Sequence, residues 1–231
     1  MHKTDRVYTC IIQEKIVSPE EFTNVIEKIS EWTSSGTING ITKHYDLSDF
    51  IKATNYVFGE NTTYFTDDTV NTWGTILRNL MSKCTKPIEY ANLLSFAYYG
   101  VFPFDEDGDG RVNTKMTCEL ILNTMLDLCN TAKDIAECFS FSKLESEWYD
   151  EYFKETLVMK AFEKGVSLSS DISDLYRLCV DEDRYQIVPP TYHVKLNKYL
   201  FDQIVSRKAE LSDDMIETFN DYWEIEGFVI Q

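Results

Sequence analysis

The chain contains 231 residues, of which 43% are hydrophobic and 14% aromatic, so it can bury a large core and is not a disordered tail. Acidic residues outnumber basic residues by 39 to 22. The resulting net charge of −17 argues against a general binder of nucleic acid or anionic lipid, since both kinds of protein present a cationic surface. With 9 glycines and 5 prolines, long linkers and all-β architectures are disfavoured as well.

The N-terminus and the cysteines indicate an intracellular protein. Met1 to Arg6 leads into no long apolar stretch of the signal-peptide kind, and no run approaches the ~20 apolar residues of a membrane span. The cysteines form no C-x-x-C pair and lie in apolar sequence, so we expect buried free thiols in a reducing compartment. They are Cys10, Cys84, Cys118, Cys129, Cys138 and Cys179.

Helical signals recur along the chain. The first begins at Ser18, which can cap a helix, with Pro19 suited to the first turn and Glu21 closing a capping box. This helix is expected to end near Trp32. The later helices are expected at Asp46 to Phe58, Thr69 to Ser82, Ile88 to Tyr99, Thr114 to Cys129, Asp134 to Phe139, Glu145 to Phe162, Ile172 to Cys179, Leu196 to Arg207 and Ser212 to Tyr222. Strand signals are slight, with Tyr185 to Val188 the clearest, so the predicted fold class is mainly α.

One acidic segment has the pattern of a calcium-binding loop. Asp105 to Met116 reads DEDGDGRVNTKM, with carboxylates at positions 1, 3 and 5 and a glycine at position 6 that allows a sharp turn. Oxygen ligands at this spacing suit a hard cation such as Ca²⁺. The predicted ligands are Asp105, Asp107, Asp109, the backbone carbonyl of Arg111, and Asn113.

Position 12 of this loop departs from the pattern, because Met116 stands where a bidentate Glu belongs. Glu119 lies almost one helical turn further on and is poorly placed to replace it. We therefore expect Ca²⁺ binding that is weak or absent, with a dissociation constant of ~1 mM or more. The alternative structure is a solvated Asp/Gly turn between two helices.

A short repeat supports the loop interpretation. Asp67 to Thr72 reads DDTVNT and resembles DGRVNT at Asp109 to Thr114, and a periodic helix follows each copy. In this interpretation Val70 and Val112 lie side by side and form the short antiparallel link of paired loops, while the first copy binds no metal.

These features resemble the EF-hand superfamily, in particular its calaxin and neuronal-calcium-sensor-like branch. Ile88 to Leu126 carries the best match, and Leu47 to Gly59 and Glu155 to Phe162 carry weaker ones. The resemblance implies paired helix–loop–helix units, Ca²⁺ binding, and a place on ciliary or sperm axonemes near dynein-docking components or tubulin. The hand that the family would have near Phe139 to Tyr152 is missing its acidic ladder. A dockerin, whose calcium repeat the loop also resembles, is a weaker match because dockerins are short, secreted and duplicated.

Together these observations predict an N-terminal degenerate EF-hand-like lobe at 19–82, a second lobe with the recognisable loop at 83–165, and a helical C-terminal extension at 166–231. The expected function is a non-enzymatic adaptor of the cytoskeleton that binds protein partners, with no nucleic acid and no membrane. The alternative is a single-hand Ca²⁺ sensor that exposes an apolar groove to a partner helix. Catalysis is disfavoured because His2, His44 and His193 show no metal-ligand spacing and no glycine-rich phosphate loop occurs.

Two further segments bear on partner binding. The apolar C-terminus, which includes Trp223, Phe228 and Ile230, is expected to dock on the protein itself rather than on a neighbour. The best basic cluster is the first candidate for a contact with acidic tubulin, although a solvated helix face is the simpler interpretation. It consists of Lys195, Lys198, Arg207 and Lys208.

Overall fold

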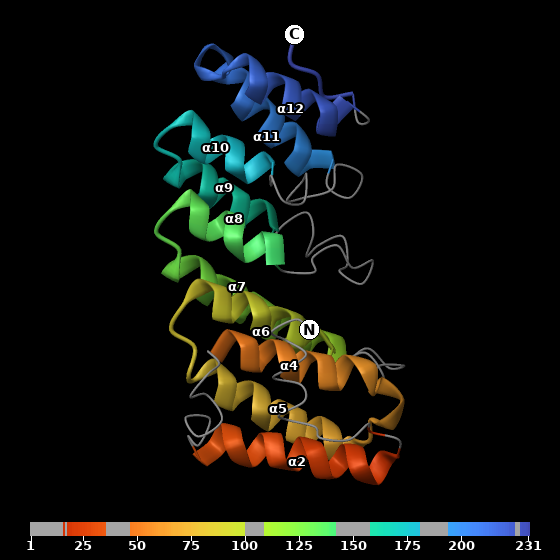
Figure 1. Cartoon of the computed structure of the whole chain (residues 1–231). Coiled ribbons are helices and arrows are strands. Elements are labelled where there is room, and N and C mark those ends of the chain that lie inside the picture. Colours follow the sequence, from red (N-terminus) through yellow and green to blue (C-terminus); the bar gives the residue numbers. More distant parts are fainter. Residues whose placement is uncertain are drawn as a thin grey trace. The chain divides into compact units, whose positions relative to one another are not determined.

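The computed structural model describes residues 16, 18–35, 47–99, 109–141, 158–180, 194–224 and 227–231. In these ranges every regular element is an α-helix or a short 3-10 helix, which confirms the predicted mainly α class (Figure 1). The chain forms two compact units, Met1–Met125 and Leu126–Gln231. These differ from the three segments that the sequence predicts. The strand signal at Tyr185 to Val188 lies outside the described residues.

The first unit is built from helices that begin where the sequence places capping residues. Its elements are α2 (Pro19–Ser35), α4 (Leu47–Glu60), η1 (Thr62–Tyr64), α5 (Asp67–Met81) and α6 (Pro87–Tyr99), followed by α7 (Asp109–Leu128), which contains the boundary between the units. The Glu21 N–H donates to the Ser18 hydroxyl at 3.2 Å, which confirms Ser18 as a cap. At the start of α6 the Glu89 carboxylate accepts the N–H groups of Thr85 and Lys86 at 2.8 and 3.0 Å.

Aromatic rings join the helices of the first unit. The ring of Phe58 on α4 lies 5.8 Å from that of Phe22 on α2 and 5.1 Å from that of Phe96 on α6, and Trp73 on α5 lies 5.8 Å from Phe96. All four side chains are buried, and edge-to-face contacts at such distances stabilise a core beyond the area they bury. The helical spacing of apolar residues thus predicts the inner faces correctly.

Side-chain amides link these helices, and of these amides Asn92 is buried while Asn55 and Asn79 are partly buried. Asn92 on α6 donates to the Ser48 hydroxyl of α4 at 2.5 Å, and the Asn92 carbonyl accepts from the Asn55 amide of α4 at 3.0 Å. On the other side Asn79 of α5 donates to the hydroxyls of Thr33 and Ser34 of α2 at 3.3 and 3.0 Å. A buried amide without such partners is costly, so these bonds favour one pairing of helices over others.

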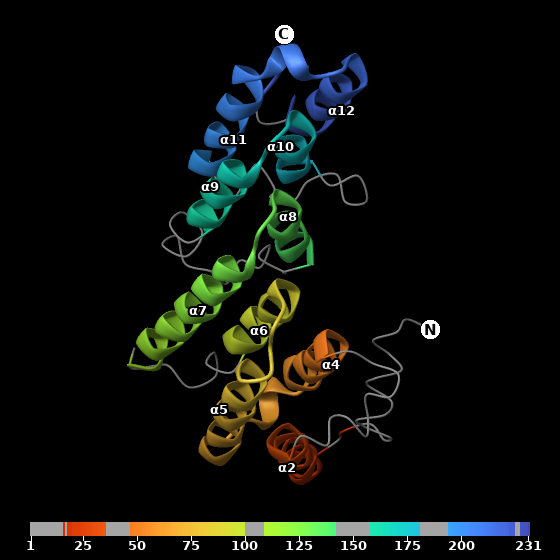
Figure 2. The same ribbon diagram turned by 90° about the vertical axis from the view of Figure 1, so that its left-hand side faces the viewer.

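The second unit is a stack of short helices in two layers. After α7 it contains α8 (Ala132–Phe141), α9 (Met159–Leu168), α10 (Ile172–Cys179), α11 (Val194–Ser206), η4 (Lys208–Glu210) and α12 (Asp213–Trp223). Figure 2 shows α9 and α11 in one layer and α8, α10 and α12 in the other. From α8 to α11, each helix packs on the helix that follows it in sequence. In addition, α8 packs on α10 and α9 packs on α11, as in a helical repeat.

A repeated turn joins the helix pairs of this stack. Before α8 the Asp134 carboxylate accepts the N–H groups of Asn130 and Thr131, both at 2.9 Å, and Thr131 accepts the Asp134 N–H at 3.1 Å. Forty residues later the Asp174 carboxylate accepts the Ser170 N–H at 3.2 Å, and Asp171 accepts the Asp174 N–H at 3.0 Å. These reciprocal caps are a structural repeat that the sequence analysis does not identify.

The helices of the stack meet closely at Gly165. A Cβ at this position would lie 3.0 Å from both terminal carbons of Leu178 on α10 and 3.3 Å from Cγ2 of Ile135 on α8. Glycine therefore lets α9 pack against two helices at once. The domain boundary expected near residue 165 falls inside this packed helix.

Helix α7 differs from its prediction in its first residue and in the residues that it buries. It begins at Asp109 rather than Thr114, and Leu120, expected to be buried, is 56% exposed. Because Leu120, Ile121 and Leu122 are consecutive, one helix face cannot cover all three, and Leu120 is the one left outside.

We expect the Gly165→Ala variant to unfold more easily than the wild type, by about 1 kcal/mol or more, since Leu178 and Ile135 must move. The matched control is Gly74→Ala in α5, where the nearest atom to the added Cβ is the end of Arg78 at 3.7 Å and the gain in helix propensity of about 0.5–1 kcal/mol should raise stability. Urea denaturation measures both variants. Equal effects of the two substitutions would contradict the close packing at Gly165.

Candidate functional site

The predicted calcium ligands divide between two parts of the chain. Asp105 and Asp107 lie outside the described residues, whereas Asp109, Arg111 and Asn113 lie in the first two turns of α7. On a helix, positions four apart share a face and positions two apart do not. Asp109 and Asn113 are four positions apart in this helix, and Arg111 is two positions from each. The full ligand set stays a prediction, and its second half is helical rather than looped.

The repeat at Asp67 to Thr72 marks a helix start. Thr66 caps α5 by accepting the Thr69 N–H at 3.3 Å, and the Thr69 hydroxyl accepts the Thr66 N–H at 2.7 Å. Val70 and Val112 both lie in helices, α5 and α7. The antiparallel link expected between them is therefore wrong, because a helical backbone directs its hydrogen bonds along its own axis. The two similar segments share the role of opening a helix.

The basic cluster is partly neutralised by its own neighbours. The Lys198 ammonium lies 2.9 Å from the Asp202 carboxylate, and the Arg207 guanidinium binds Glu210 through two bonds of 2.8 and 2.7 Å. The hydrogen bond from Arg207 lowers the pKa of Glu210, and the same bond raises the pKa of Arg207. Such pairs leave less positive charge for an acidic partner than the sequence suggests.

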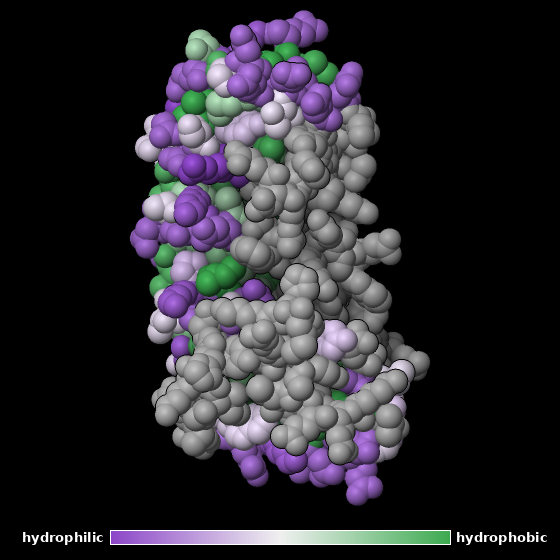
Figure 3. All heavy atoms as spheres, viewed as in Figure 1, coloured by the Kyte–Doolittle hydropathy of each residue, from purple (hydrophilic) through white to green (hydrophobic). Residues whose placement is uncertain are grey.

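The outer face of α12 carries the most one-sided charge in the second unit. Two adjacent carboxylates open the helix, the later ones follow three or four residues apart through the C-cap residue, all are exposed, and the helix contains no lysine or arginine. They are Asp213, Asp214, Glu217, Asp221 and Glu224. Within the described part of the chain none of them forms an ion pair. Hydrophilic side chains gather around α11 and α12 at this end of the unit (Figure 3).

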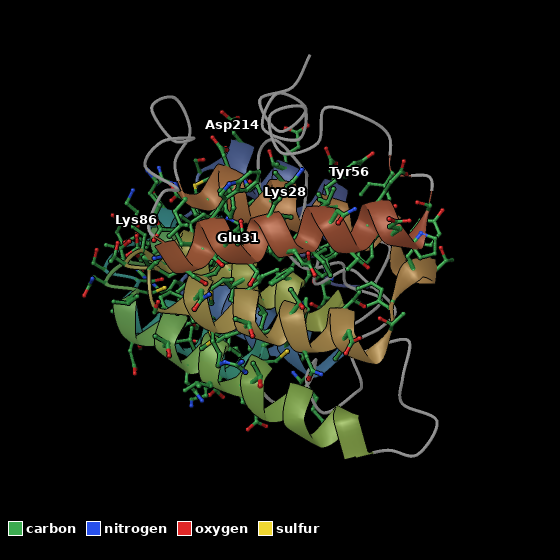
Figure 4. All side chains as sticks on the ribbon, turned by 90° about the horizontal axis from the view of Figure 1, so that it is seen from below. Lys28, Glu31, Tyr56, Lys86 and Asp214 are labelled. Atoms are coloured by element: carbon green, nitrogen blue, oxygen red, sulfur yellow. The ribbon has the colours of Figure 1, made fainter. Side chains whose placement is uncertain are left out.

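The exposed surface of α2 is acidic as well, but it includes a cation, since Lys28 and Glu31 lie together on the outer side of the helix (Figure 4). Mixed charges are the usual composition of a solvated surface. The row of carboxylates on α12 is different, because like charges at this spacing destabilise the helix that carries them.

The inner face of α12 is held firmly. Trp223 is fully buried and stacks on Phe219 at 5.1 Å, and Phe228 lies 5.7 Å from Trp223 and 5.1 Å from Phe201 of α11. Asn220 exchanges two hydrogen bonds with the backbone of Ile230, at 3.0 and 2.8 Å. The prediction that the apolar C-terminus docks on the protein itself is thus confirmed for Phe228 and Ile230, whereas Val229 is 40% exposed.

A left-handed glycine makes this docking possible. Gly227 has φ of 76°, its N–H donates to the Glu224 carbonyl at 2.8 Å, and the Phe228 N–H donates to the Trp223 carbonyl at 3.3 Å. This is the Schellman pattern, in which the residue after the glycine packs on the last helical turn. It turns the chain back so that Phe228 reaches the aromatic cluster.

The described cysteines are buried free thiols, as predicted; Cys10 lies outside the described residues. Burial raises the pKa of Cys84 and of Cys118 to about 12, with a smaller contribution from Glu89 and Glu119 respectively, and burial also raises the pKa of Cys179. Cys129 and Cys138 are different, because the protonation of each of these two buried thiols depends on that of the other.

Comparison with protein-family models, curated proteins and solved structures finds no match to this chain. Among the described residues no helix is both long and apolar enough to span a bilayer. Nor does that part of the chain gather three or more His, Cys, Asp or Glu side chains in one possible metal site.

Calorimetric titration of the full chain with Ca²⁺ tests the predicted loop. Because Met116 offers no oxygen and α7 begins at Asp109, we expect no saturable heat at micromolar Ca²⁺, and binding no tighter than ~1 mM. Saturable micromolar binding that the Asp105→Ala variant abolishes would contradict this expectation and support the sensor.

The buried thiols predict a loss of stability at alkaline pH. The pKa of Cys118 is higher in the folded chain than in the unfolded chain, so the unfolded chain releases its proton first as the pH rises. The stabilisation is complete below the unfolded pKa of 9.0 and is lost as the pH rises toward about 12. One such thiol contributes ~1.4 kcal/mol per pH unit in this range.

The free energy of unfolding should therefore fall less steeply above pH 9.0 in Cys118→Ala than in the wild type, with parallel curves at neutral pH. Urea denaturation across this range measures the two slopes. Identical alkaline slopes would show that Cys118 keeps an ordinary pKa in the folded chain.

Proposed function

We propose that this protein is a non-enzymatic adaptor that binds a basic segment of a partner protein on the outer face of α12. The observation that carries the proposal is the row of exposed carboxylates on this helix, without a cation on the same helix and without an ion pair in the described part of the chain. A field of one sign attracts and orients a partner of the opposite sign.

The repulsion among these carboxylates destabilises α12, which supports a role in binding rather than in folding. Asp213, Glu217 and Asp221 are spaced four apart, and Glu224 caps the C-terminus, where the helix dipole disfavours negative charge. Each unfavourable pair costs a few tenths of a kcal/mol. Only Asp213 and Asp214 in the first turn are favourably placed with respect to the dipole. A basic partner would remove the repulsion on binding.

The scaffold suits such a role. The inner face of α12 is fixed by Phe219 and Trp223, so the outer face is presented on a rigid support. Stacked helix pairs provide extended binding surfaces in repeat proteins. Both features favour an adaptor over an enzyme.

The charge also bears on the partners implied by the calaxin resemblance. Tubulin is acidic, and the cluster proposed to contact it is partly paired with Asp202 and Glu210. The α12 face has the wrong sign for an acidic surface. Within an axonemal setting, which rests on the resemblance alone, a basic segment of another component is the better-matched partner.

Reversing one charge on α12 distinguishes a role of these carboxylates in binding from a role in stability. We expect Asp221→Lys to weaken binding of a lysine- and arginine-rich peptide by about tenfold, while the melting temperature stays the same or rises because a repulsion is removed. Fluorescence anisotropy with the full chain measures the affinity at several salt concentrations. The affinity of the wild type should fall with salt more steeply than that of the variant.

Glu27→Lys is the matched control, since it makes the same change in net charge on an exposed position of α2. It should leave the affinity almost unchanged. Equal losses in the two variants would mean that the peptide responds to net charge alone, and the α12 proposal would then be wrong.

A further inference from the structure

The backbone of residues 227–231 is bound by a side chain of α12. The Asn220 side chain donates from its amide N–H to the Ile230 carbonyl at 3.0 Å, and its carbonyl oxygen accepts the Ile230 N–H at 2.8 Å. One side chain thus pairs with both main-chain groups of one residue. Main-chain hydrogen bonds of this kind give affinity in sites that bind an extended segment, and the side chains at alternate positions of that segment give specificity.

The side chains of this segment alternate between the protein and the solvent. The ring of Phe228 lies 5.1 Å from that of Phe201 on α11 and 5.7 Å from that of Trp223 on α12. Val229 is 40% exposed, whereas Ile230 is 4% exposed. This order is that of an extended peptide that presents every second side chain to one surface. The surface that receives them, called the tail site below, consists of Phe201, Asn220 and Trp223.

The tail site contains a hydrogen-bond donor that the segment does not use. The Trp223 side chain is fully buried, and among the described residues its indole N–H has no acceptor. A buried donor without a partner destabilises the folded chain. An occupant that brings an oxygen acceptor to this group would satisfy it, so residues 228–230 do not complement the tail site fully.

Few side chains hold the segment in place. Three of the five residues 227–231 are exposed, so the docking depends on the other two, Phe228 and Ile230. No atom lies within 4 Å of the position that a Cβ would take at Gly227, so the turn that leads into the segment is not packed. Segments with so little burial open at a lower free energy than the helices beside them.

We propose that the tail site binds an extended segment of a partner protein, in which an aromatic residue is followed two positions later by an aliphatic residue. Residues 228–230, with the sequence Phe-Val-Ile, occupy the site as a competing segment of the same chain. Their contacts identify the chemistry of the partner. An aromatic ring packs on Phe201 and Trp223, and the backbone of the aliphatic residue pairs with Asn220.

Tethering makes the chain's own segment a strong competitor. A segment that is joined to its site by a short connection acts at a high effective concentration, in the millimolar range for flexible connections. The apparent affinity of a partner is reduced in proportion to the fraction of molecules whose site is open. Variants that weaken the docking of residues 228–230 should therefore bind a partner segment more tightly than the wild type.

Fluorescence anisotropy of the full chain with a labelled peptide tests the site. The peptide Gly-Phe-Val-Ile-Gln, blocked at both ends, reproduces residues 227–231 and is uncharged, so its binding does not depend on the carboxylates of the outer face of α12. We expect the double variant Phe228→Ala with Ile230→Ala to bind it about tenfold more tightly than the wild type. Val229→Ala, at the exposed position, is the matched control and should bind as the wild type. Adding Asn220→Ala to the double variant should remove most of the gain.

Hydrogen exchange of the wild type gives a second measurement that needs no variant. The Ile230 N–H should exchange more slowly than in an unstructured peptide, but about tenfold faster than the N–H groups in the middle of α12, because the segment leaves while the helix stays folded. An Ile230 N–H that exchanges only together with α12 would overturn the proposal. So would a double variant that keeps its helical circular dichroism and binds the peptide no more tightly than the wild type.

Discussion

Carboxylate capping of tight turns is the interaction on which the second unit depends. Asp134 and Asp174 each hold the turn before their helix, and each in turn has its N–H accepted by a side chain of that turn. These bonds satisfy donors that would otherwise be left free at the helix start, and they fix the direction in which the next helix leaves. With that direction set, Gly165 lets α9 approach α8 and α10 closely enough for their apolar faces to interlock.

The proposed binding face is held in place by packing within the same unit. The face of α12 is an exposed surface whose charge is unfavourable for its own helix, and the aromatic cluster of Phe219, Trp223 and Phe228 fixes it in place.

Periodicity predicted the helices well because a helix buries one stripe of its surface. The apolar positions Phe22, Ile26 and Ile29 are buried as expected, and Ser18 and Ser212 cap the helices that they precede. Where several apolar residues are consecutive, as at Leu120 to Leu122, periodicity names no single face, and the exposed residue was assigned wrongly. Asp67 to Thr72 and Asp109 to Thr114 each open a helix, and an acidic first residue is favourable there because of the helix dipole.

The features most relevant to function needed the three-dimensional structure. The burial of the thiols could be predicted from the apolar sequence around Cys84, Cys118, Cys129, Cys138 and Cys179. The capping aspartates could have been found from the T-x-x-D and D-x-x-D patterns ending at Asp134 and Asp174. The carboxylates of α12 were visible as a helix start, but their common outward face depends on which side Trp223 and Phe219 bury.

Hydrogen exchange of the full chain, with and without an excess of a lysine- and arginine-rich peptide, tests the central claim most directly. The adaptor account predicts slower exchange of backbone amides in α12 when the peptide is present, at low salt, with little change in α2 or α5. Protection centred on another helix, or no protection at peptide concentrations that saturate binding, would contradict it.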